Sequence, residues 1–141
     1  MGQAREIMDR VTDATLGAKD YAALTECYAE DAVMITPDAG EVQGRKAVVD
    51  YLREFADAFP DSRYESLNKF ESGDTAIDEG WFIGTNTTPL PMPDGQTIPA
   101  TGKAVRLRHA DFARVVDGRI VEHRFYFDQM AFLQQLGLSP Q

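Results

Sequence analysis

The sequence predicts an α+β fold in which a strongly curved antiparallel or mixed sheet carries about three helices on its concave face and encloses a pocket. The chain reads helix, helix, strand, helix and then a meander of strands. Residues 104–128 form two long alternating segments around Asp117-Gly118, a strong hairpin signal because glycine takes the positive φ of the turn. The length of 141 residues predicts a single domain over residues 1–141.

The first half of the chain is predicted to be mainly helical. Residues 3–16 form an amphipathic helix, and Asp20 caps a second helix over residues 21–31. Residues 32–36 make a short strand that Pro37 ends. The third helix covers residues 44–60, and its inward stripe is aromatic and aliphatic: Val48, Tyr51, Leu52, Phe55 and Phe59.

The second half of the chain is predicted to be mainly sheet. Residues 62–72 and 75–87 form two strands, and the glycines around Trp81 predict a bulge or bend there. Residues 88–101 are a proline-rich loop whose length suits a rim or partial lid over the open end of the sheet. After the hairpin, a short helix over residues 128–136 completes the pattern.

The hairpin places the only two histidines of the sequence on one face. Side chains alternate along a strand, so His109 and Asp111 point to the same side, and pairing brings His123 there as well. With a three-residue loop at 116–118, Asp111 faces His123 and His109 faces Phe125. The rest of this face is apolar, which makes the trio the best functional clue in the sequence.

The trio of His109, Asp111 and His123 suits proton transfer. A carboxyl in an apolar pocket has a raised pKa, and an adjacent imidazole can share or relay its proton. Such a pair removes a proton next to a carbonyl and returns it elsewhere, as cyclisation, isomerisation and dehydration require. The alternative interpretation is a buried hydrogen-bonded trio that fixes strand register. Two histidines and one carboxylate without a further ligand do not predict a metal site, and no cofactor is expected.

Composition excludes several classes of function. The formal net charge of -9 argues against nucleic acid and anionic membranes as partners, since either needs a basic face. The single cysteine, Cys27, excludes an internal disulfide and a multi-cysteine zinc site, and a small buried residue is expected there. No apolar run reaches membrane-spanning length and no signal-peptide core is present, so a cytoplasmic location is expected.

Large side chains on the third helix and the strands are candidates to line the pocket, and each has an alternative interpretation as ordinary core. Asn86, near a strand end, is a candidate to orient a substrate carbonyl, or it caps a turn. The predicted substrate-binding residues are Tyr28, Met34, Tyr51, Phe55, Phe59, Trp81, Asn86, Phe125 and Phe127.

The order of elements and three segments resemble the SnoaL-like polyketide cyclases, within the wider NTF2-like superfamily that includes ketosteroid isomerases, scytalone dehydratases and limonene epoxide hydrolases. The segments are YAEDAVMITP, GRKAVVDYLREF and DFARVVDGRIVEHRFYFDQMAFLQQLGL. The resemblance covers nearly the whole chain. It implies a cone-shaped fold and a homodimer formed through the exposed sheet face, while it says less about chemistry because the superfamily includes non-catalytic members.

The resemblance also implies roles for individual residues. Asp128 matches the aspartate that SnoaL-like cyclases use as an acid/base, although it directly precedes a helix, where Asp is a favoured N-cap. Asp111 falls where ketosteroid isomerases keep a protonated aspartate. Phe125 falls where limonene epoxide hydrolases carry a water-activating aspartate. The histidine that SnoaL-like cyclases place on the penultimate strand falls nearer Ala113 or Arg114, and His109 lies on the same predicted face without matching it directly.

The leading hypothesis is a cofactor-independent acid/base enzyme acting on a small hydrophobic carbonyl compound, as a polyketide cyclase, isomerase or dehydratase. Asp128 or Asp111 would move the proton, and His109 and His123 would tune or relay it. One alternative is a non-catalytic module for small-molecule binding or dimerisation. A further alternative is an epoxide hydrolase, which requires a replacement for the aspartate that is absent at Phe125.

Overall fold

The computed structural model describes residues 2–92 and 94–138 as a curved sheet with helices packed on its inner face. The helical elements are α1 (Gln3–Thr12), the π-helical turn η1 (Asp13–Gly17), α2 (Tyr21–Glu26), α3 (Arg45–Ala58) and α4 (Gln129–Gln135). The strands of the main sheet are β1 (Tyr28–Thr36), β2 (Gly40–Gln43), β3 (Arg63–Ser72), β4 (Thr75–Thr85), β7 (Ala104–Val116) and β8 (Arg119–Phe127). The predicted α+β class is confirmed.

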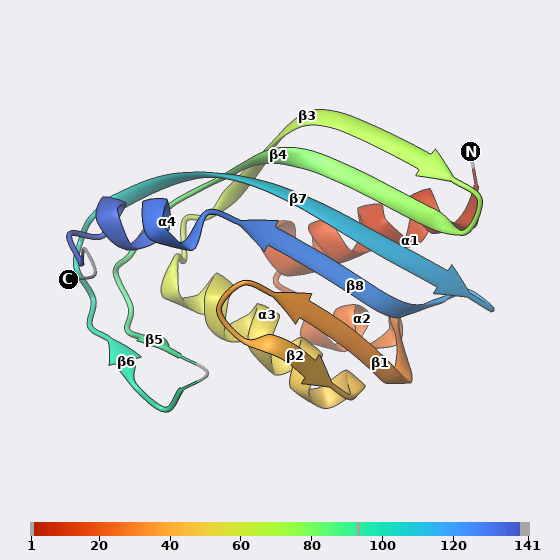
Figure 1. Cartoon of the computed structure of the whole chain (residues 1–141), viewed down its shortest axis with the longest axis horizontal. Coiled ribbons are helices and arrows are strands. Elements are labelled where there is room, and N and C mark those ends of the chain that lie inside the picture. Colours follow the sequence, from red (N-terminus) through yellow and green to blue (C-terminus); the bar gives the residue numbers. More distant parts are fainter. Residues whose placement is uncertain (1, 93, 139–141) are drawn as a thin grey trace.

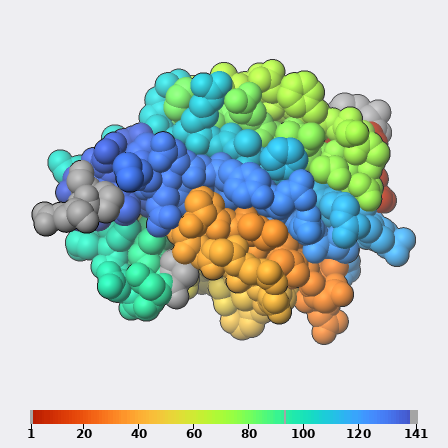
Figure 2. Space-filling model, viewed as in Figure 1, coloured from red at the N-terminus to blue at the C-terminus, as the bar shows by residue number. Residues whose placement is uncertain are grey.

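The sheet is mixed and open, with the strand order β2-β1-β8-β7-β4-β3. All neighbours are antiparallel except β1 and β8, which run parallel. Helices α1, α2 and α3 lie on one face, and α4 lies at the end of the β7–β8 hairpin (Figure 1). Figure 2 shows the opposite face, where the strands lie side by side and α1 is almost hidden behind them. None of the described helices is long and apolar enough to cross a membrane.

The β7–β8 hairpin differs from its predicted register by two residues. Its loop has two residues, Asp117 (φ 51°) and Gly118 (φ 79°), rather than the three that were predicted. A bulge then leaves Val121 without a partner, because Arg114 pairs with Glu122 while Val115 pairs with Ile120. A shift of two residues leaves every side chain beyond the bulge on its predicted face, since the side-chain period of a strand is two.

Direct partners across the hairpin therefore change. Asp111 lies opposite Phe125, His109 lies opposite Phe127, and His123 lies opposite Ala113. The predicted pairings of Asp111 with His123 and of His109 with Phe125 are wrong.

Strand β1 begins earlier than predicted. The second helix ends at Glu26 rather than at residue 31, and the chain is extended from Tyr28 onward. Parallel pairing with β8 accounts for this, because Tyr28 pairs with Ile120 and Met34 with His123. Pairing with a central strand outweighs the helical pattern of the sequence here. The predicted N-cap Asp20 is confirmed, and its side chain accepts a hydrogen bond from the backbone N–H of Ala23.

Strand β4 alternates strictly, so the predicted bulge near Trp81 is absent from it. The bulge lies on the neighbouring strand β3, between Ser66 and Asn68. Glycine is required at position 80 because a side chain would not fit there, not because of its backbone angles. A Cβ atom at Gly80 would overlap the Tyr64 ring and lie 2.5 Å from the Glu65 carbonyl oxygen. The missing side chain therefore lets the Tyr64 ring lie flat on the inner face.

The proline-rich loop contains a small two-stranded sheet, β5 (Leu90–Pro91) with β6 (Thr97–Ile98). Leu90 and Ile98 are buried in the same hydrophobic cluster as Phe55 and Phe59 of the α3 region. The loop is thus packed on the end of the core rather than extended over it. Pro93, one of its four prolines, lies outside the described residues.

Candidate active site

The inner face of the sheet, α3 and η1 enclose a cavity of about 70 Å³. Most of its wall is apolar. This volume is well below the roughly 300–1,000 Å³ of typical small-molecule sites, so it holds a very small molecule or one end of a larger one. The polar and ionisable groups at its sheet side are Tyr64, Asp78, His109, Asp111 and His123.

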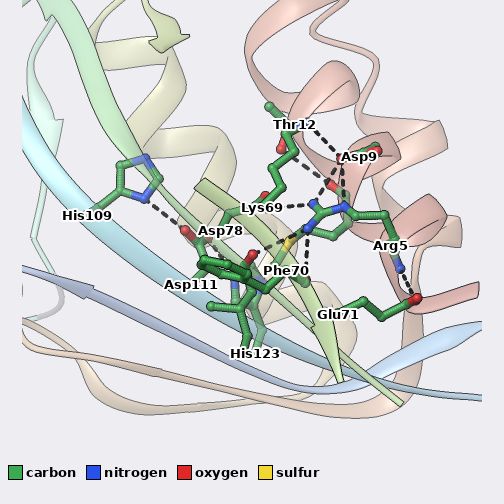
Figure 3. A network of polar contacts seen from close by, with 12 residues as sticks. Arg5, Asp9, Thr12, Lys69, Phe70, Glu71, Asp78, His109, Asp111 and His123 are labelled. Carbon is green, nitrogen blue, oxygen red and sulfur yellow. Dashed lines mark hydrogen bonds and ion pairs between the residues drawn. The ribbon is translucent and has the colours of Figure 1, made fainter. Parts of the chain in front are cut away.

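The carboxylate of Asp111 joins both histidines. Its Oδ1 lies 2.8 Å from Nδ1 of His109, and its Oδ2 lies 2.9 Å from Nε2 of His123 (Figure 3). His109 and Asp111 are two residues apart on β7 and so point to the same side, and His123 reaches them from β8. The structure thus brings the three predicted side chains into one hydrogen-bonded cluster.

Asp111 is held in its ionised form. Burial raises the pKa of this carboxyl, but hydrogen bonds from His109 and then His123 outweigh burial and bring its pKa down to about 2. The predicted raised pKa is therefore wrong. A protonated aspartate, as the resemblance to ketosteroid isomerases implied for this position, is also wrong. Asp111 accepts hydrogen bonds from both imidazoles and does not carry the proton itself.

Tyr28 fixes the state of His123. The Tyr28 hydroxyl lies 2.7 Å from Nδ1 of His123, and the planes of the two rings are nearly parallel, 11° apart. Burial raises the pKa of Tyr28 well above its usual value, so the hydroxyl stays protonated and donates a hydrogen bond to Nδ1 of His123. The other nitrogen of His123, Nε2, then carries the hydrogen that is donated to Asp111. Tyr28 is fully buried and is absent from the cavity wall.

His109 has one nitrogen free. Its Nδ1 donates to Asp111, and the other ring nitrogen points away from Asp111 in Figure 3. Among residues 2–92 and 94–138, no protein group hydrogen-bonds to Nε2 of His109. The ring lies at the cavity wall beside Phe125 and Tyr64, with ring centroids 5.4 and 5.2 Å away. His109 is therefore bound to Asp111 through one ring nitrogen, while its other ring nitrogen has no described protein partner at the cavity wall.

A second carboxylate, Asp78, lies directly opposite Asp111 in the β4–β7 pair. It is 2% exposed and forms an ion pair with Arg5 of α1, with 2.6 Å between Oδ1 and Nη2. Burial raises the pKa of Asp78, and the positive charge of Arg5 offsets this only in part. Strand alternation predicts that Asp78 points inward. No sequence signal identified Arg5, because it follows the polar positions of an amphipathic helix.

Contacts from β3 position Arg5. Its guanidinium also binds Asp9 of the same helix at 2.9 Å. The Glu71 carboxylate accepts hydrogen bonds from the backbone N–H groups of Gly2 and Arg5, each at 2.9 Å, and so caps the first turn of α1. Figure 3 shows the contact with Arg5. The edge strand therefore sets the position of the helix that neutralises Asp78.

Three predicted substrate-binding residues, Tyr51, Phe55 and Phe125, line the cavity. Three others, Met34, Phe59 and Phe127, are buried in the core and are not part of its wall. Their aromatic and sulfur-containing side chains fill space between the sheet and helices, which matches the alternative interpretation as core.

Trp81 and Asn86 lie away from the cavity. Trp81 is on the outer face of the sheet, where the guanidinium of Arg106 stacks 3.9 Å from its ring centroid. Asn86 is fully buried, and its side chain hydrogen-bonds the backbone of Thr88 and Thr101, each at 2.9 Å. These bonds tie the loop to the strand end. The structure therefore places neither residue at the cavity wall.

Asp128 is exposed, and its carboxylate accepts a hydrogen bond from the backbone N–H of Ala131 at 3.0 Å, which caps α4. It does not line the cavity. The acid/base role that the resemblance implied for Asp128 is therefore not supported by its position. Across residues 2–92 and 94–138, no group of three or more His, Cys, Asp or Glu side chains is arranged to hold a metal ion.

Solved structures share the fold over nearly the full chain. A proposed SnoaL-like polyketide cyclase from Jannaschia sp. CCS1 has a TM-score of 0.84 and 20% identity, covering 98% of this chain and 94% of that one. IdmH, a proposed polyketide cyclase from Streptomyces antibioticus, has a TM-score of 0.77 and 26% identity, covering 96% and 99%. A protein with a ketosteroid isomerase-like fold from Catenulispora acidiphila, in complex with trimethylamine, has a TM-score of 0.74 and 17% identity, covering 94% and 93%.

A comparison with curated proteins finds no match. A comparison with protein families does find one, because the SnoaL-like domain matches residues 8–123, which is most of the sequence. The match includes α3, β3, β4, β7 and the part of β8 that carries His123. The chain therefore belongs to the family of SnoaL-like domains.

Proposed function

We propose that the protein is a cofactor-independent acid/base enzyme that moves a proton on a small hydrophobic carbonyl compound, as an isomerase or cyclase does. The observation that carries this proposal is the Asp111 carboxylate held between two imidazoles, one of which presents a free nitrogen at an apolar cavity. His109 is the general base, and Asp111 is its positioning residue.

The proton moves from carbon to His109. Nε2 of His109 accepts the proton from the carbon next to the substrate carbonyl, and the electron pair of the broken C–H bond moves toward the carbonyl oxygen, giving an enolate. The imidazolium that forms is stabilised by the ionised Asp111 beside its Nδ1. Return of the proton to another carbon completes an isomerisation. Alternatively, the enolate carbon attacks a second carbonyl and forms a ring, the π electrons of that carbonyl move to its oxygen, and the imidazolium of His109 protonates the resulting alkoxide.

The remaining members of the cluster keep Asp111 in place. His123 and Tyr28 form a hydrogen-bonded chain that ends on Oδ2 of Asp111, so this oxygen is occupied and the carboxylate cannot rotate freely. Oδ1 is left for His109. Such a chain fixes the tautomer of His109 with hydrogen on Nδ1, the form that leaves Nε2 as the acceptor.

The apolar wall favours a hydrophobic substrate. Phe55, Phe82 and Phe125 border the cavity with Leu52 and Val11. Exclusion of water strengthens the electrostatic interaction between the imidazolium and Asp111, and it prevents premature quenching of the enolate by water.

A non-catalytic binding module would need the apolar wall alone, whereas an enzyme needs at least two titratable groups that face one cavity within hydrogen-bond reach. His109, Asp111 and His123 satisfy that second requirement. For the epoxide hydrolase alternative, Phe125 supplies an aromatic wall and no carboxylate at that position. The enzyme acting on carbonyl compounds is therefore the better supported proposal.

Hydrogen–deuterium exchange tests the proposal without knowledge of the natural substrate. Small cyclic ketones, beginning with cyclopentanone, are incubated with the protein in D2O, and loss of the α-proton signal is followed by NMR. The wild-type protein should accelerate exchange, and His109→Gln should lose about 10²-fold or more of that acceleration. Wild-type exchange no faster than buffer, or equal exchange by His109→Gln, would contradict the proposal.

A further inference from the structure

Buried hydroxyls that lack a hydrogen-bond partner are concentrated at the cavity. Among the described residues, three buried side-chain hydroxyls have no hydrogen-bond partner, Thr15 Oγ1, Ser62 Oγ and Tyr64 Oη, and a fourth buried oxygen, Asp78 Oδ1, is held by its ion pair with Arg5 alone. All except Ser62 belong to residues that line the cavity. The hydroxyls of Thr15 and Tyr64 have no ion pair of this kind, and the Ser66 hydroxyl is the polar side chain close to that of Tyr64. Because a buried hydroxyl without a partner is unfavourable, these two groups call for an explanation.

Tyr64 reaches the cavity from the edge strand β3. Its ring lies over Gly80, and Gly80 pairs directly with His109 in the β4–β7 pair. The phenol is thus placed next to the imidazole, with 5.2 Å between the ring centroids. Burial, followed by the nearby Asp78 carboxylate, raises the pKa of Tyr64 to about 12, so the hydroxyl remains a donor at neutral pH.

Thr15 reaches the cavity from η1 on the opposite side. In the regular helix just before it, Thr12 donates its hydroxyl to the backbone carbonyl of Met8, as threonines in helices commonly do. The π-helical turn at Asp13–Gly17 changes this geometry, and the Thr15 hydroxyl has no such carbonyl partner. Single π-helical turns occur often at functional sites.

We propose that the Tyr64 and Thr15 hydroxyls form a subsite for the substrate's carbonyl oxygen, which accepts a hydrogen bond from each. This inference rests on the proposed function and adds to it the orientation of the substrate. A carbonyl oxygen has two lone pairs and so satisfies both hydroxyls at once. With the oxygen held there, the adjacent C–H group faces His109, and the charge that develops on the oxygen lies between two donors.

The subsite restricts the substrate class. The cavity of about 70 Å³ has room for the reacting carbonyl and its α-carbon, and none of the described residues that line it is a lysine or arginine that could pair with a carboxylate group. Ketones and aldehydes therefore fit this subsite, while carboxylates do not.

Binding of matched ligands tests the subsite independently of catalysis. Cyclopentanone and methylenecyclopentane have nearly the same shape, but only the ketone accepts hydrogen bonds. Dissociation constants are measured by ligand-observed NMR for the wild type, Tyr64→Phe and Thr15→Val. The wild type should prefer the ketone, and each variant should weaken ketone binding roughly 5-fold while leaving the hydrocarbon unchanged. Tyr64→Phe should also slow α-proton exchange about 10²-fold.

Two control variants test whether the weaker ketone binding is specific to the hydroxyls of Tyr64 and Thr15. Tyr126 is exposed on the outer face of the sheet and does not line the cavity, so Tyr126→Phe should keep the preference for the ketone. Ser62→Ala removes a partnerless hydroxyl away from the cavity and should also keep it. The melting temperatures of Tyr64→Phe and Thr15→Val should equal or exceed that of the wild type, since each removes an unsatisfied group.

The outcomes separate the subsite from the proposed function. An unchanged ketone preference in both Tyr64→Phe and Thr15→Val would overturn the subsite, as would a wild type that binds neither ligand. Absence of α-proton exchange together with a preference that depends on Tyr64 would reject the proton transfer and support the subsite. Exchange that depends on His109 but not on Tyr64 or Thr15 would reject the subsite alone.

Discussion

Two carboxylates that face each other across one pair of strands have opposite surroundings. Asp78 on β4 is neutralised by a guanidinium from α1, and Asp111 on β7 is held by two imidazoles from the sheet itself. Arginine keeps its charge throughout the physiological pH range, whereas histidine gains and loses a proton near neutral pH. The Asp78 pair is therefore electrostatically fixed, and the Asp111 cluster is the one that can exchange protons.

The two sites also differ in the direction of their pKa changes. Burial raises the pKa of Asp78, with partial compensation by Arg5, while two imidazole donors bring the pKa of Asp111 to about 2 despite its burial. Negative charge at Asp78 is thus tolerated because Arg5 is there, and negative charge at Asp111 is favoured by hydrogen bonds. We infer that the Asp78 pair holds the helix on the sheet and that Asp111 holds the proposed general base.

The largest loss of stability is expected when Arg5, the cation paired with Asp78, is replaced. Arg5→Met leaves a buried carboxylate without an ion-pair partner, and the free energy of unfolding at pH 7 should fall by about 3–5 kcal/mol. Urea unfolding measures this change. The loss should shrink at low pH, because protonation of Asp78 removes the unpaired charge.

The matched control for this variant is an exposed ion pair. Lys46 and Asp50 lie 2.7 Å apart on the surface of α3, and Lys46→Ala should change the unfolding free energy by less than about 1 kcal/mol. Similar losses for Arg5→Met and Lys46→Ala would contradict the view that burial distinguishes the Asp78 pair.

A smaller change in the free energy of unfolding, limited to acidic pH, is expected for Asp111→Asn. The pKa of its carboxyl falls from 3.8 to about 2 on folding, which corresponds to about 2 kcal/mol. A folded-state pKa below the unfolded one means that this stability is fully present above about pH 4 and is lost as the pH falls toward 2. The stability gap between the wild type and Asp111→Asn should therefore close by about 2 kcal/mol over this range.

Urea unfolding at several pH values between 2 and 6 measures that gap. Asp111→Asn should also slow α-proton exchange by about 10²-fold, because an amide offers only one acceptor oxygen and cannot hold both histidines as the carboxylate does. Parallel stability curves for the two proteins would show that Asp111 is not selectively stabilised as an anion.

Strand periodicity was sufficient to predict which side chains share the cavity face. His109, Asp111 and His123 remain together even though the predicted register was wrong by two residues, because such a shift preserves the face. The bulge at Val121 was not predictable, since neither a glycine nor a proline marks it. The alternation of residues along each strand thus determined which face of the sheet a side chain occupies. The pairing of β7 with β8 determined which residues lie opposite each other.

Residues that act through distant contacts were harder to predict. Arg5 follows the polar pattern of an amphipathic helix, and only its pairing with Asp78 explains its burial. Tyr64 was missed as well, although Gly80 on the neighbouring strand was a signal that a large side chain lies over it. The glycines around Trp81 predicted a bulge or bend that would interrupt alternation, whereas β4 alternates strictly and directs Trp81 outward.

The smallest effect is expected at a third carboxylate, Asp128, which lies outside the cavity. Asparagine is as good an N-cap as aspartate, so Asp128→Asn should leave both α-proton exchange and stability nearly unchanged, whereas Asp128→Ala should lose about 1 kcal/mol. Urea unfolding and the ketone exchange assay measure both quantities. A loss of exchange of 10²-fold or more in Asp128→Asn, with unchanged stability, would transfer the acid/base role from the His109–Asp111 pair to Asp128, as the resemblance to SnoaL-like cyclases implied. It would also require the end of β8 to move, because the Asp128 carboxylate is now bound to the first turn of α4.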